Sequence, residues 1–239
     1  MHPRFRLLGL LADGHFHSGE ALGAALDLSR AGVWKLVQSL ADLGLEVSAV
    51  PGRGYRLEHA FQLLDAERIL SAVDPAARGR LARVEVLPTV DSTNRFLQSL
   101  GASGAPSGTV CLAEHQSAGR GRRGRTWISP FGAALYLSLL WRFPLAPAAL
   151  GPLSVAVGVL VAEALEDLGV EGAGLKWPND LLWRGRKLAG VLTEVAGEAT
   201  GPAQVVIGLG VNVHLPPAVG DAIDQPWVDL STLLGGPVD

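Results

Sequence analysis

Residues 116–125 combine glycine and arginine in a pattern suited to binding an anion. Within six residues lie four arginines, interleaved with glycines: Gly119, Arg120, Gly121, Arg122, Arg123, Gly124 and Arg125. Crowded guanidinium groups repel one another unless an anion lies among them, and glycine lets the backbone approach that anion closely. The pattern predicts a loop that binds phosphate or carboxylate and becomes ordered when occupied. A solvated basic loop is the alternative interpretation.

The glycines of this loop also satisfy the G-x-G-x-x-G spacing of dinucleotide-binding proteins. That fingerprint requires a helix directly after the glycines, so that the helix N-terminus faces the pyrophosphate. Here Trp127 and Pro130 follow, and then a strand-like run. The spacing therefore does not mark a dinucleotide site, and the sequence has no G-x-x-x-x-G-K-[ST] phosphate loop.

Lysine is rare in this chain, which has seventeen arginines and three lysines. Two of the three, Lys176 and Lys187, lie in the short segments KWPND and RKLAG. A compact ammonium differs in shape from a planar guanidinium, so we expect these two positions to require an ammonium at a site. Chance placement is the alternative.

Two weaker patterns complete the set. The segment GLGVN, from Gly208 to Asn212, predicts a strand whose glycines permit close contact with a ligand or ring. The segment DSTN, from Asp91 to Asn94, is by itself no more than a helix N-cap.

The elements that must carry these residues fall into two groups. The first 60 residues predict three short helices, with apolar positions at Leu7, Leu10 and Leu11 in the first and N-caps at Ser18 and Ser29 for the others. Strand-like runs at 45–50 and 55–57 flank a Pro-Gly-Arg-Gly turn. This order is typical of a winged helix-turn-helix, and a protein-binding or structural module is the alternative. The residues expected to face DNA are Ser29, Arg30, Trp34, Lys35, Gln38 and Arg53.

From residue 61 to residue 239 we expect a second domain, in which strands at 84–87, 109–113, 135–141, 188–194 and 205–213 alternate with helices at 94–100 and 153–168. The fold class is therefore α+β, with a mixed sheet. Residues 148–165 are nearly all apolar, but glycine and proline interrupt them and acidic residues follow. We interpret them as a buried core helix rather than a membrane span.

Composition bounds the function. The chain has 239 residues, of which 48% are hydrophobic and 18% charged, and a net charge of -3, which excludes a disordered chain and a uniformly basic polyanion-binding body. The single cysteine, Cys111, excludes an intramolecular disulfide and fits a reducing, cytoplasmic environment. The six histidines have no metal-binding spacing, so we predict no metal ligands.

Taken together and in order, five motifs resemble those of bacterial biotin protein ligases of the bifunctional type, which also act as biotin operon repressors. The motifs begin at Asp91 (DSTN), Gly119 (GRGRRGR), Lys176 (KWPND), Arg186 (RKLAG) and Gly208 (GLGVN). The resemblance implies a winged helix-turn-helix followed by a mixed-sheet catalytic domain of the class II biotin/lipoate ligase type. Members usually continue with a helix and an SH3-like barrel; only 27 residues follow Asn212 here, so we expect both to be absent.

The resemblance also implies the roles of individual residues. The implied biotin site comprises Ser92, Thr93, Asn94, Gln116, Gly119, Arg120, Gly121, Arg122, Lys187, Gly208 and Gly210. The implied ATP site comprises Arg123, Arg125, Trp127, Lys176, Asn179 and Asn212. Lys187 and Arg122 are the implied catalytic residues, and Mg²⁺ is expected with ATP.

The activity that the resemblance implies has two steps: formation of biotinyl-5'-AMP from biotin and ATP, then transfer of biotin to a lysine of the biotin carboxyl carrier protein. Implied partners are that protein, operator DNA and a second copy of the chain when the adenylate is bound, with no membrane. Two alternatives remain open, namely a biotin-sensing DNA-binding regulator without transfer and a related lipoate or acyl-carrier ligase.

Overall fold

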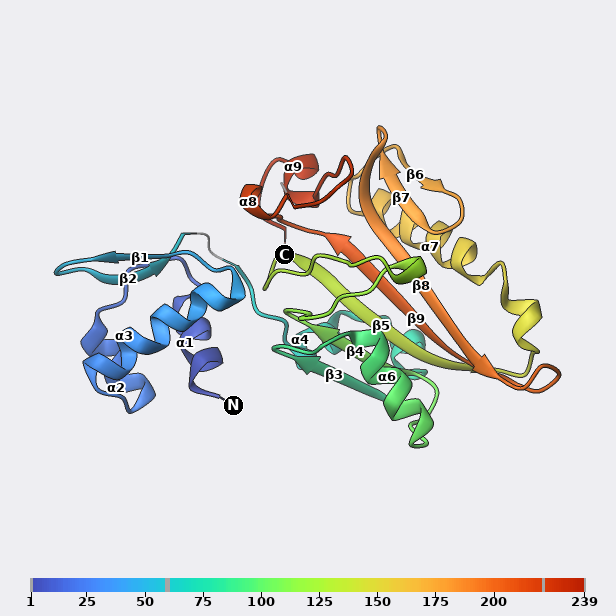
Figure 1. The fold of residues 1–239 in the computed structure, drawn as a ribbon, viewed down its shortest axis with the longest axis horizontal. Coiled ribbons are helices and arrows are strands. Elements are labelled where there is room, and N and C mark those ends of the chain that lie inside the picture. The colour runs from blue at the N-terminus through green and yellow to red at the C-terminus, as the bar shows by residue number, and fades with distance from the viewer. Residues whose placement is uncertain (1, 59–60, 221, 239) are drawn as a thin grey trace. The chain divides into compact units, whose positions relative to one another are not determined.

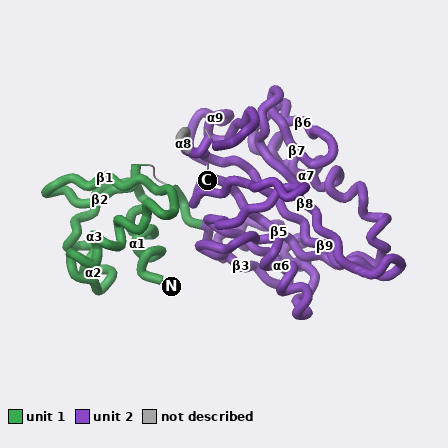
Figure 2. Tube along the Cα trace, viewed as in Figure 1, with its two compact units in different colours: residues 1–63 green, residues 64–239 purple. Residues whose placement is uncertain are grey.

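The computed structural model describes residues 2–58, 61–220 and 222–238. The chain divides into two compact units, residues 1–63 and 64–239 (Figure 2). The boundary expected between residues 60 and 61 adjoins residues 59 and 60, which lie outside the described residues.

The first unit has the predicted order of three helices and a hairpin. Its elements are α1 (Pro3–Leu11), α2 (Gly19–Leu26), α3 (Arg30–Gln38), the 3-10 helix η1 (Ser39–Leu43), β1 (Val47–Val50) and β2 (Gly54–Leu57). The predicted caps are confirmed: Ser18 Oγ accepts from Ala21 N at 3.0 Å, and Ser29 Oγ accepts from Gly32 N at 3.2 Å. These caps satisfy amide groups that a helix N-terminus otherwise leaves unpaired.

Packing in this unit differs from the sequence expectation in α1, and a 3-10 turn follows α3. In α1 the buried stripe contains Leu8 beside Leu7 and Leu11, whereas Leu10 is only partly buried. The third helix ends as an α-helix at Gln38, and its last apolar residues, Leu40 and Leu43, are buried from a tighter 3-10 turn. The Leu40 and Leu43 side chains therefore still close the core, although the helical geometry changes beneath them.

The second unit is built on one seven-stranded sheet with the order β3-β4-β5-β9-β8-β7-β6 (Figure 1). The strands are β3 (Arg83–Leu87), β4 (Thr109–Ala113), β5 (Ala134–Phe143), β6 (Ala173–Lys176), β7 (Asp180–Trp183), β8 (Arg186–Gly197) and β9 (Ala203–Asn212). β3 and β4 are parallel and the other neighbours are antiparallel, so the predicted mixed sheet is confirmed. The short strands β6 and β7 are additions to the predicted set.

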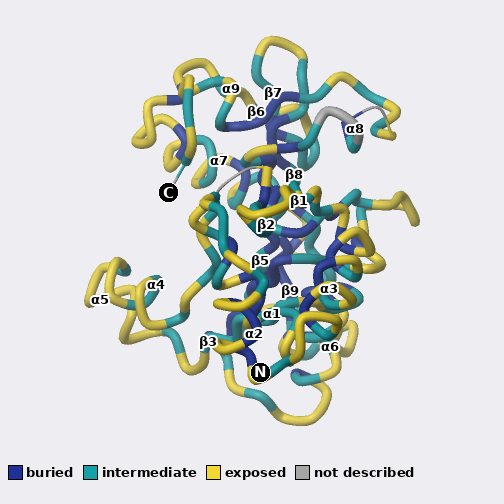
Figure 3. Tube along the Cα trace, turned by 90° about the vertical axis from the view of Figure 1, so that its left-hand side faces the viewer, coloured by how far each residue is buried: buried dark blue, intermediate teal, exposed yellow. Residues whose placement is uncertain are grey.

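Helices and 3-10 turns connect these strands. They are α4 (Ala66–Ala72), α5 (Pro75–Arg78), α6 (Thr93–Ala102), η2 (Arg122–Gly124), η3 (Pro147–Leu150), α7 (Leu153–Asp167), α8 (Pro217–Gly220) and α9 (Leu230–Leu234). The predicted helices correspond to α6 and α7. Burial is concentrated in the sheet, whereas α5 is exposed throughout (Figure 3).

The alternation of side chains along β9 divides the core between the two faces of the sheet. Val205 and Val211 belong to the cluster that packs with α7, whereas Val206 packs with Leu97 of α6. Successive residues of a strand point to opposite faces, so α6 and α7 cover opposite faces of the sheet. Gly208 and Gly210 therefore lie on the α6 face.

Helix α7 is less buried than a core helix. Gly158 and Leu165 are buried, but Val159 is 46% and Leu160 63% exposed. The prediction of a buried core helix is therefore wrong for one side of α7, which packs only its other side on the sheet. By length and composition alone, residues 147–167 are long and apolar enough to cross a membrane, and 17% of that window is buried. Such a helix is weak evidence of a span, because core helices of soluble proteins have the same composition.

Candidate functional site

On the α6 face of the sheet lies a set of uncharged polar side chains, here called the buried polar cluster. Its members are Thr93, Asn94, Gln116, Ser129 and Ser138. Thr93, Asn94, Ser129 and Ser138 are all buried. Buried polar groups are costly unless they are hydrogen-bonded, so the bonding pattern of this cluster determines what it can offer a ligand.

Asn94 is the member that spans the sheet. Its Oδ1 accepts from Ser138 Oγ at 2.6 Å, and its Nδ2 donates to Leu192 O at 3.2 Å. Ser138 and Leu192 belong to β5 and β8, and both pair with Gly208 of the intervening β9. A Cβ at Gly208 would lie 2.2 Å from Asn94 Oδ1. Gly208 is therefore required because the Asn94 amide lies directly over it.

Thr93 and Gln116 form the second half of the cluster. Gln116 Oε1 accepts from Thr93 N at 2.9 Å, and Gln116 Nε2 donates to Ser129 Oγ at 3.1 Å. Ser129 Oγ in turn donates to Trp127 O at 2.9 Å. Asp91 and Ser92 precede the helix, where Asp91 Oδ1 accepts from Ser92 N at 2.7 Å. Ser92 occupies the N-cap position of α6 without a capping side-chain hydrogen bond, so the DSTN segment is not simply a serine cap.

The basic loop, residues 119–125, begins and ends against this cluster. Gly119 is buried, and a Cβ there would lie 2.3 Å from Trp127 O and 2.4 Å from Ser129 Oγ. Trp127 N donates to Gly119 O at 2.9 Å, and Gly121 N donates to Arg125 O at 2.7 Å. The two stems of the loop are therefore tied together by backbone hydrogen bonds. Ordering of the loop on occupation stays a prediction.

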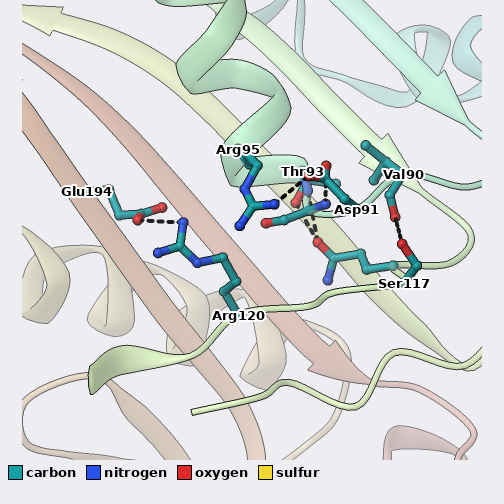
Figure 4. A network of polar contacts seen from close by, with 9 residues as sticks. Val90, Asp91, Thr93, Arg95, Ser117, Arg120 and Glu194 are labelled. Atoms are coloured by element: carbon teal, nitrogen blue, oxygen red, sulfur yellow. Dashed lines mark hydrogen bonds and ion pairs between the residues drawn. The ribbon is translucent and has the colours of Figure 1, made fainter. Parts of the chain in front are cut away.

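The four arginines of the loop have different surroundings. Arg120 Nη1 lies 3.3 Å from Glu194 Oε1 (Figure 4), and Arg122 Nη1 donates to Asn179 Oδ1 at 3.2 Å. Arg123 and Arg125 are exposed, and Arg123 adopts a left-handed conformation with φ 56°. The loop thus directs one guanidinium group at β8 and one at the turn between β6 and β7, and leaves two in solvent.

Trp127 covers the glycines of β8 and β9. Cβ atoms placed at Gly210 and Gly190 would lie 2.7 Å and 3.1 Å from its ring. Its indole Nε1 is buried and has no hydrogen-bond partner in the described part of the chain. Lys187 Nζ lies 5.2 Å from the ring centroid, within the range of a cation–π contact. The structure therefore brings together Trp127, predicted for the ATP site, and Lys187, predicted for the biotin site.

Lys187 is held on more than one side. Its Nζ lies 2.9 Å from Asp180 Oδ1, and the two side chains are 15% and 22% exposed. Its backbone N donates to Pro226 O at 2.8 Å, and its O accepts from Val228 N at 3.0 Å. Residues 226–228 therefore extend the sheet locally at Lys187, a contact that the sequence did not suggest.

The remaining residues predicted for the ATP site lie around this pair. Lys176 is exposed at the end of β6, opposite Asp180. Asn179 Nδ2 donates to Val191 O at 2.8 Å. Asn212 is buried, and its Nδ2 donates to the carbonyl oxygens of Lys187 and Val228 at 3.2 Å and 3.1 Å. Asn212 therefore supports the backbone of Lys187 with its amide nitrogen. A cleft nearby is lined by Arg122, Trp177, Pro178, Thr193 and the first turn of α7.

Burial raises the pKa of three titratable groups beneath the site, Cys111, Glu114 and Tyr136. It raises the pKa of Cys111 to about 12, so this thiol is not a nucleophile at neutral pH. Burial also raises the pKa of Glu114 to about 7, although Leu64 N, which donates to Glu114 Oε1 at 2.5 Å, opposes the increase. Glu114 directly follows β4, two residues before Gln116.

In the first unit, α3 presents the residues expected to face DNA. Arg30, Lys35 and Gln38 are exposed, and Trp34 is 53% exposed, whereas Val33 and Val37 are buried. Ser29 caps the helix. Arg53 is exposed on the hairpin, where its guanidinium lies 4.2 Å from the Phe16 ring centroid. A polar, cationic face with one large aromatic is thus displayed by α3.

Several residues around the basic loop and the buried polar cluster lie outside the five sequence motifs. These are Ser129, Ser138, Glu194, Trp227 and Asp229. Asp180 belongs to the KWPND segment, but its contact with Lys187 was not predicted. Strand alternation could have placed Ser138 and Glu194 on the face of Gly208, but only once the pairing of β5, β8 and β9 was known. Among the described residues, no group of three or more His, Cys, Asp or Glu could hold a metal ion.

An amino-terminal helix-turn-helix unit is thus joined to a mixed sheet that carries the buried polar cluster and the basic loop. Residues 86–212 match the Biotin/lipoate A/B protein ligase family, and residues 4–56 match an HTH domain. The chain belongs to the biotin/lipoate A/B protein ligase family.

Within that family, it is similar along nearly its whole length to proteins named Bifunctional ligase/repressor BirA. Identity is 50% to that of Salmonella typhimurium and 47% to that of Escherichia coli; each match covers 94% of this chain and 68% of the relative. Among solved structures, the biotin protein ligase from Aquifex aeolicus in complex with biotin and ATP is similar, with a TM-score of 0.54 and 31% identity. That match covers 66% of this chain and 64% of the Aquifex chain. The ligase from Leishmania major in complex with biotinyl-5-AMP has a TM-score of 0.53 and 26% identity.

Proposed function

We propose that this chain is an ATP-dependent biotin protein ligase that also represses transcription in response to biotin. It forms biotinyl-5'-AMP and diphosphate from biotin and ATP, and then transfers biotin to a lysine of the biotin carboxyl carrier protein. The observation that carries the proposal is one juxtaposition: an uncharged, buried polar cluster lies beside a basic loop and a lysine held on a carboxylate. The uncharged cluster can hydrogen-bond the neutral ureido ring of biotin. The cations can neutralise the biotin carboxylate and the α-phosphate of ATP, which must come together.

In the first half-reaction, a carboxylate oxygen of biotin attacks the α-phosphorus of ATP and diphosphate leaves. The carboxylate is already a nucleophile, so the protein needs to align and neutralise two repelling anions rather than supply a base. Lys187 lies where it can serve this purpose, because Asp180 and the Trp127 ring hold its ammonium before any ligand arrives. Arg120 and Arg122 approach from the loop.

The proposed division of residues follows the geometry. Thr93, Asn94, Gln116 and Ser92 bind the ureido group, with Gly208 and Gly210 providing room on the sheet for the Asn94 amide and the Trp127 ring. Arg123, Arg125, Trp127, Lys176, Asn179 and Asn212 serve the nucleotide, and of these Asn212 acts through the backbone of Lys187.

Magnesium enters this scheme as part of the substrate, Mg-ATP. The described residues contain no group that could cage the ion, and the carboxylate beside Lys187 already binds that ammonium. Magnesium is commonly bound through substrate phosphates with few protein ligands. No step of the proposed mechanism uses a protein-held metal.

In the second half-reaction, the neutral amine of the acceptor lysine attacks the acyl carbon of the mixed anhydride, and AMP leaves. Retention of the adenylate until the acceptor arrives is the proposed second role of the basic loop. The proposal for the first unit is that α3 and the Arg53 hairpin bind operator DNA, with two copies of the chain pairing when the adenylate is bound, in the cytoplasm.

The decisive experiment is biotin-dependent exchange of labelled diphosphate into ATP, followed by transfer of labelled biotin to purified carrier protein. Exchange that requires biotin, together with labelling of one lysine on the carrier, is the expected result. Exchange without transfer would instead identify a biotin-sensing regulator. Exchange that lipoate supports better than biotin would identify a lipoate ligase.

A further inference from the structure

Glu194 is a carboxylate outside the five sequence motifs, and it reaches both the basic loop and the buried polar cluster. Its Oε1 lies 3.3 Å from Arg120 Nη1 (Figure 4), and its Oε2 accepts from Asn94 Nδ2 at 2.8 Å. A carboxylate paired with arginine only accepts hydrogen bonds. The nitrogen of the Asn94 amide must therefore face Glu194, and its oxygen must face Ser138.

The hydrogens available within the cluster are fewer than its short contacts. Ser138 Oγ lies 2.6 Å from Asn94 Oδ1 and 2.7 Å from Thr93 Oγ1, and Thr93 Oγ1 lies 3.1 Å from Gln116 Oε1. Two hydroxyl hydrogens serve these three contacts. Since an amide oxygen carries no hydrogen, Ser138 donates to Asn94, and the Thr93 hydroxyl is left to donate to Ser138 at the shorter of its two contacts.

That assignment leaves one acceptor open. Gln116 Oε1 is then bonded only by Thr93 N, because the Thr93 hydroxyl hydrogen is turned toward Ser138. The Gln116 amide cannot reverse freely, since its nitrogen donates to Ser129 Oγ, whose own hydrogen goes to Trp127 O. One lone pair of Gln116 Oε1 therefore remains for an N–H donor of the ligand.

We propose that Glu194 is a positioning residue that fixes the direction of this hydrogen-bond chain and so makes the site selective for a ligand with an N–H donor. The inference rests on the proposed function, in which the donor is a ureido N–H of biotin. With a neutral amide at position 194, Asn94 can reverse, Ser138 then donates to Thr93, and the Thr93 hydroxyl occupies the Gln116 oxygen that the ligand requires. The backbone acceptor Leu192 O, at 3.2 Å, is the weaker of the two groups that orient Asn94.

The test measures biotin binding by calorimetry on the full chain, with biotin-dependent exchange as a second readout. Glu194→Gln is expected to raise the Kd and the KM for biotin roughly tenfold or more, with kcat changed less than about threefold, since a charge-assisted hydrogen bond is lost at a site that binds the ureido ring and not the reacting carboxylate. Glu194→Asp keeps the charge, and its Kd for biotin is expected to lie between that of the parent and that of Glu194→Gln. Glu198→Gln, an exposed acid in the turn after β8, is the matched control and should bind as the parent does.

Ser138→Ala supplies an independent route, because it interrupts the same chain without touching the ion pair. The double variant Ser138→Ala/Glu194→Gln should raise the biotin Kd by less than the product of the two single fold-changes, as expected for residues acting in one network. An unchanged biotin Kd in Glu194→Gln, or multiplicative effects in the double variant, would overturn the inference.

If Glu194→Gln does not fold, Ser138→Ala alone decides: a parental Kd rejects the inference. A parent that binds biotin without exchange refutes the ligase proposal and leaves the Glu194 test intact, whereas a parent that does not bind biotin rejects both.

Discussion

Lys187 Nζ lies 2.9 Å from Asp180 Oδ1, and the two residues belong to the neighbouring strands β8 and β7. The lysine side chain is 15% exposed and lies over the Trp127 ring, so its charge is positioned by the sheet rather than by a flexible loop. Preorganised charges are effective because no reorganisation is needed when negative charge develops.

Replacing Lys187 with methionine is expected to lower kcat/KM for biotin-dependent exchange by roughly 10²–10³-fold, the usual cost of losing one well-placed charge. Lys187→Arg should not restore it, because a planar guanidinium cannot occupy the position of an ammonium between Asp180 and Trp127. Steady-state exchange kinetics measure both variants, and Lys35→Met in the first unit is the control. Parental rates in Lys187→Met would contradict a role in catalysis.

Replacing Arg122 with glycine is expected to preserve measurable adenylate formation while releasing biotinyl-AMP, because the loop loses the side chain that reaches Asn179. Free adenylate acylates exposed lysines, so unrelated proteins added to the reaction should become biotinylated. Arg184→Gly is the matched control, since Arg184 has φ 47°, a conformation that glycine adopts without strain. Retention of the intermediate as tight as in the parent would refute this role.

Gly208→Ala tests the packing of Asn94 on β9. The new methyl carbon would lie 2.2 Å from Asn94 Oδ1, and overpacking of this kind typically costs about 1–3 kcal/mol. We expect weaker biotin binding together with a lower free energy of unfolding. Gly174→Ala is the control, because a Cβ at Gly174 has no atom within 4 Å. Equal behaviour of the two variants in calorimetry and urea unfolding would show that the close approach is unimportant.

The raised pKa of Glu114 predicts how stability changes with pH. Burial moves this pKa from 4.5 to about 7, so between these values the folded protein binds a proton that the unfolded chain does not. The free energy of unfolding should therefore fall as pH rises through this window, by roughly 3 kcal/mol from this group. Glu114→Gln removes this dependence and should be more stable than the parent at pH 8 but similar at pH 4.5. Urea unfolding at both pH values measures it, with the exposed Glu67→Gln as control.

The DNA proposal predicts a change in salt dependence. Lys35 is exposed on α3, and loss of one phosphate contact should reduce the slope of log K against log salt concentration by about 0.9. Lys35→Ala is therefore compared with the parent by titration of duplex DNA, in the presence of biotin and ATP, at several salt concentrations. Arg78→Ala, an exposed cation of the second unit, should leave the slope unchanged. A parental slope in Lys35→Ala would remove this residue from the interface.

Much of the fold could be predicted from the sequence, because long apolar periodicities and caps are local signals. The strand 109–113 matches β4 residue for residue, and Ser18 and Ser29 cap the helices they were expected to cap. The strands β6 and β7 were not predicted, because each has four residues and the turn between them contains Trp177 and Pro178. The partial exposure of α7 depends on which elements lie beside it, and composition does not encode that.

For the site, the sequence indicates which motif residues matter, but the contacts that explain them depend on the tertiary structure. Gly119 and Gly208 stand out in the sequence as motif glycines, but their reasons, close approach to Trp127 O and to the Asn94 amide, are tertiary. Asn212 also stands out, whereas its bond to Lys187 O becomes visible only when β8 and β9 are paired. Glu194 and Ser138 belong to no sequence motif. Their importance arises because both lie on the α6 face of the sheet and contact Asn94, which their residue types alone do not indicate.

The position of Asn94 above Gly208 has a consequence for assembly of the sheet. Gly208 is the residue opposite both Ser138 and Leu192, so a slip of β9 by one residue would place Ile207 or Leu209 beneath the amide and force it out. Register is otherwise weakly specified in glycine-rich strand segments such as Gly208–Gly210. A displaced pairing of β9 is therefore incompatible with the position of Asn94, and the binding site requires the observed register.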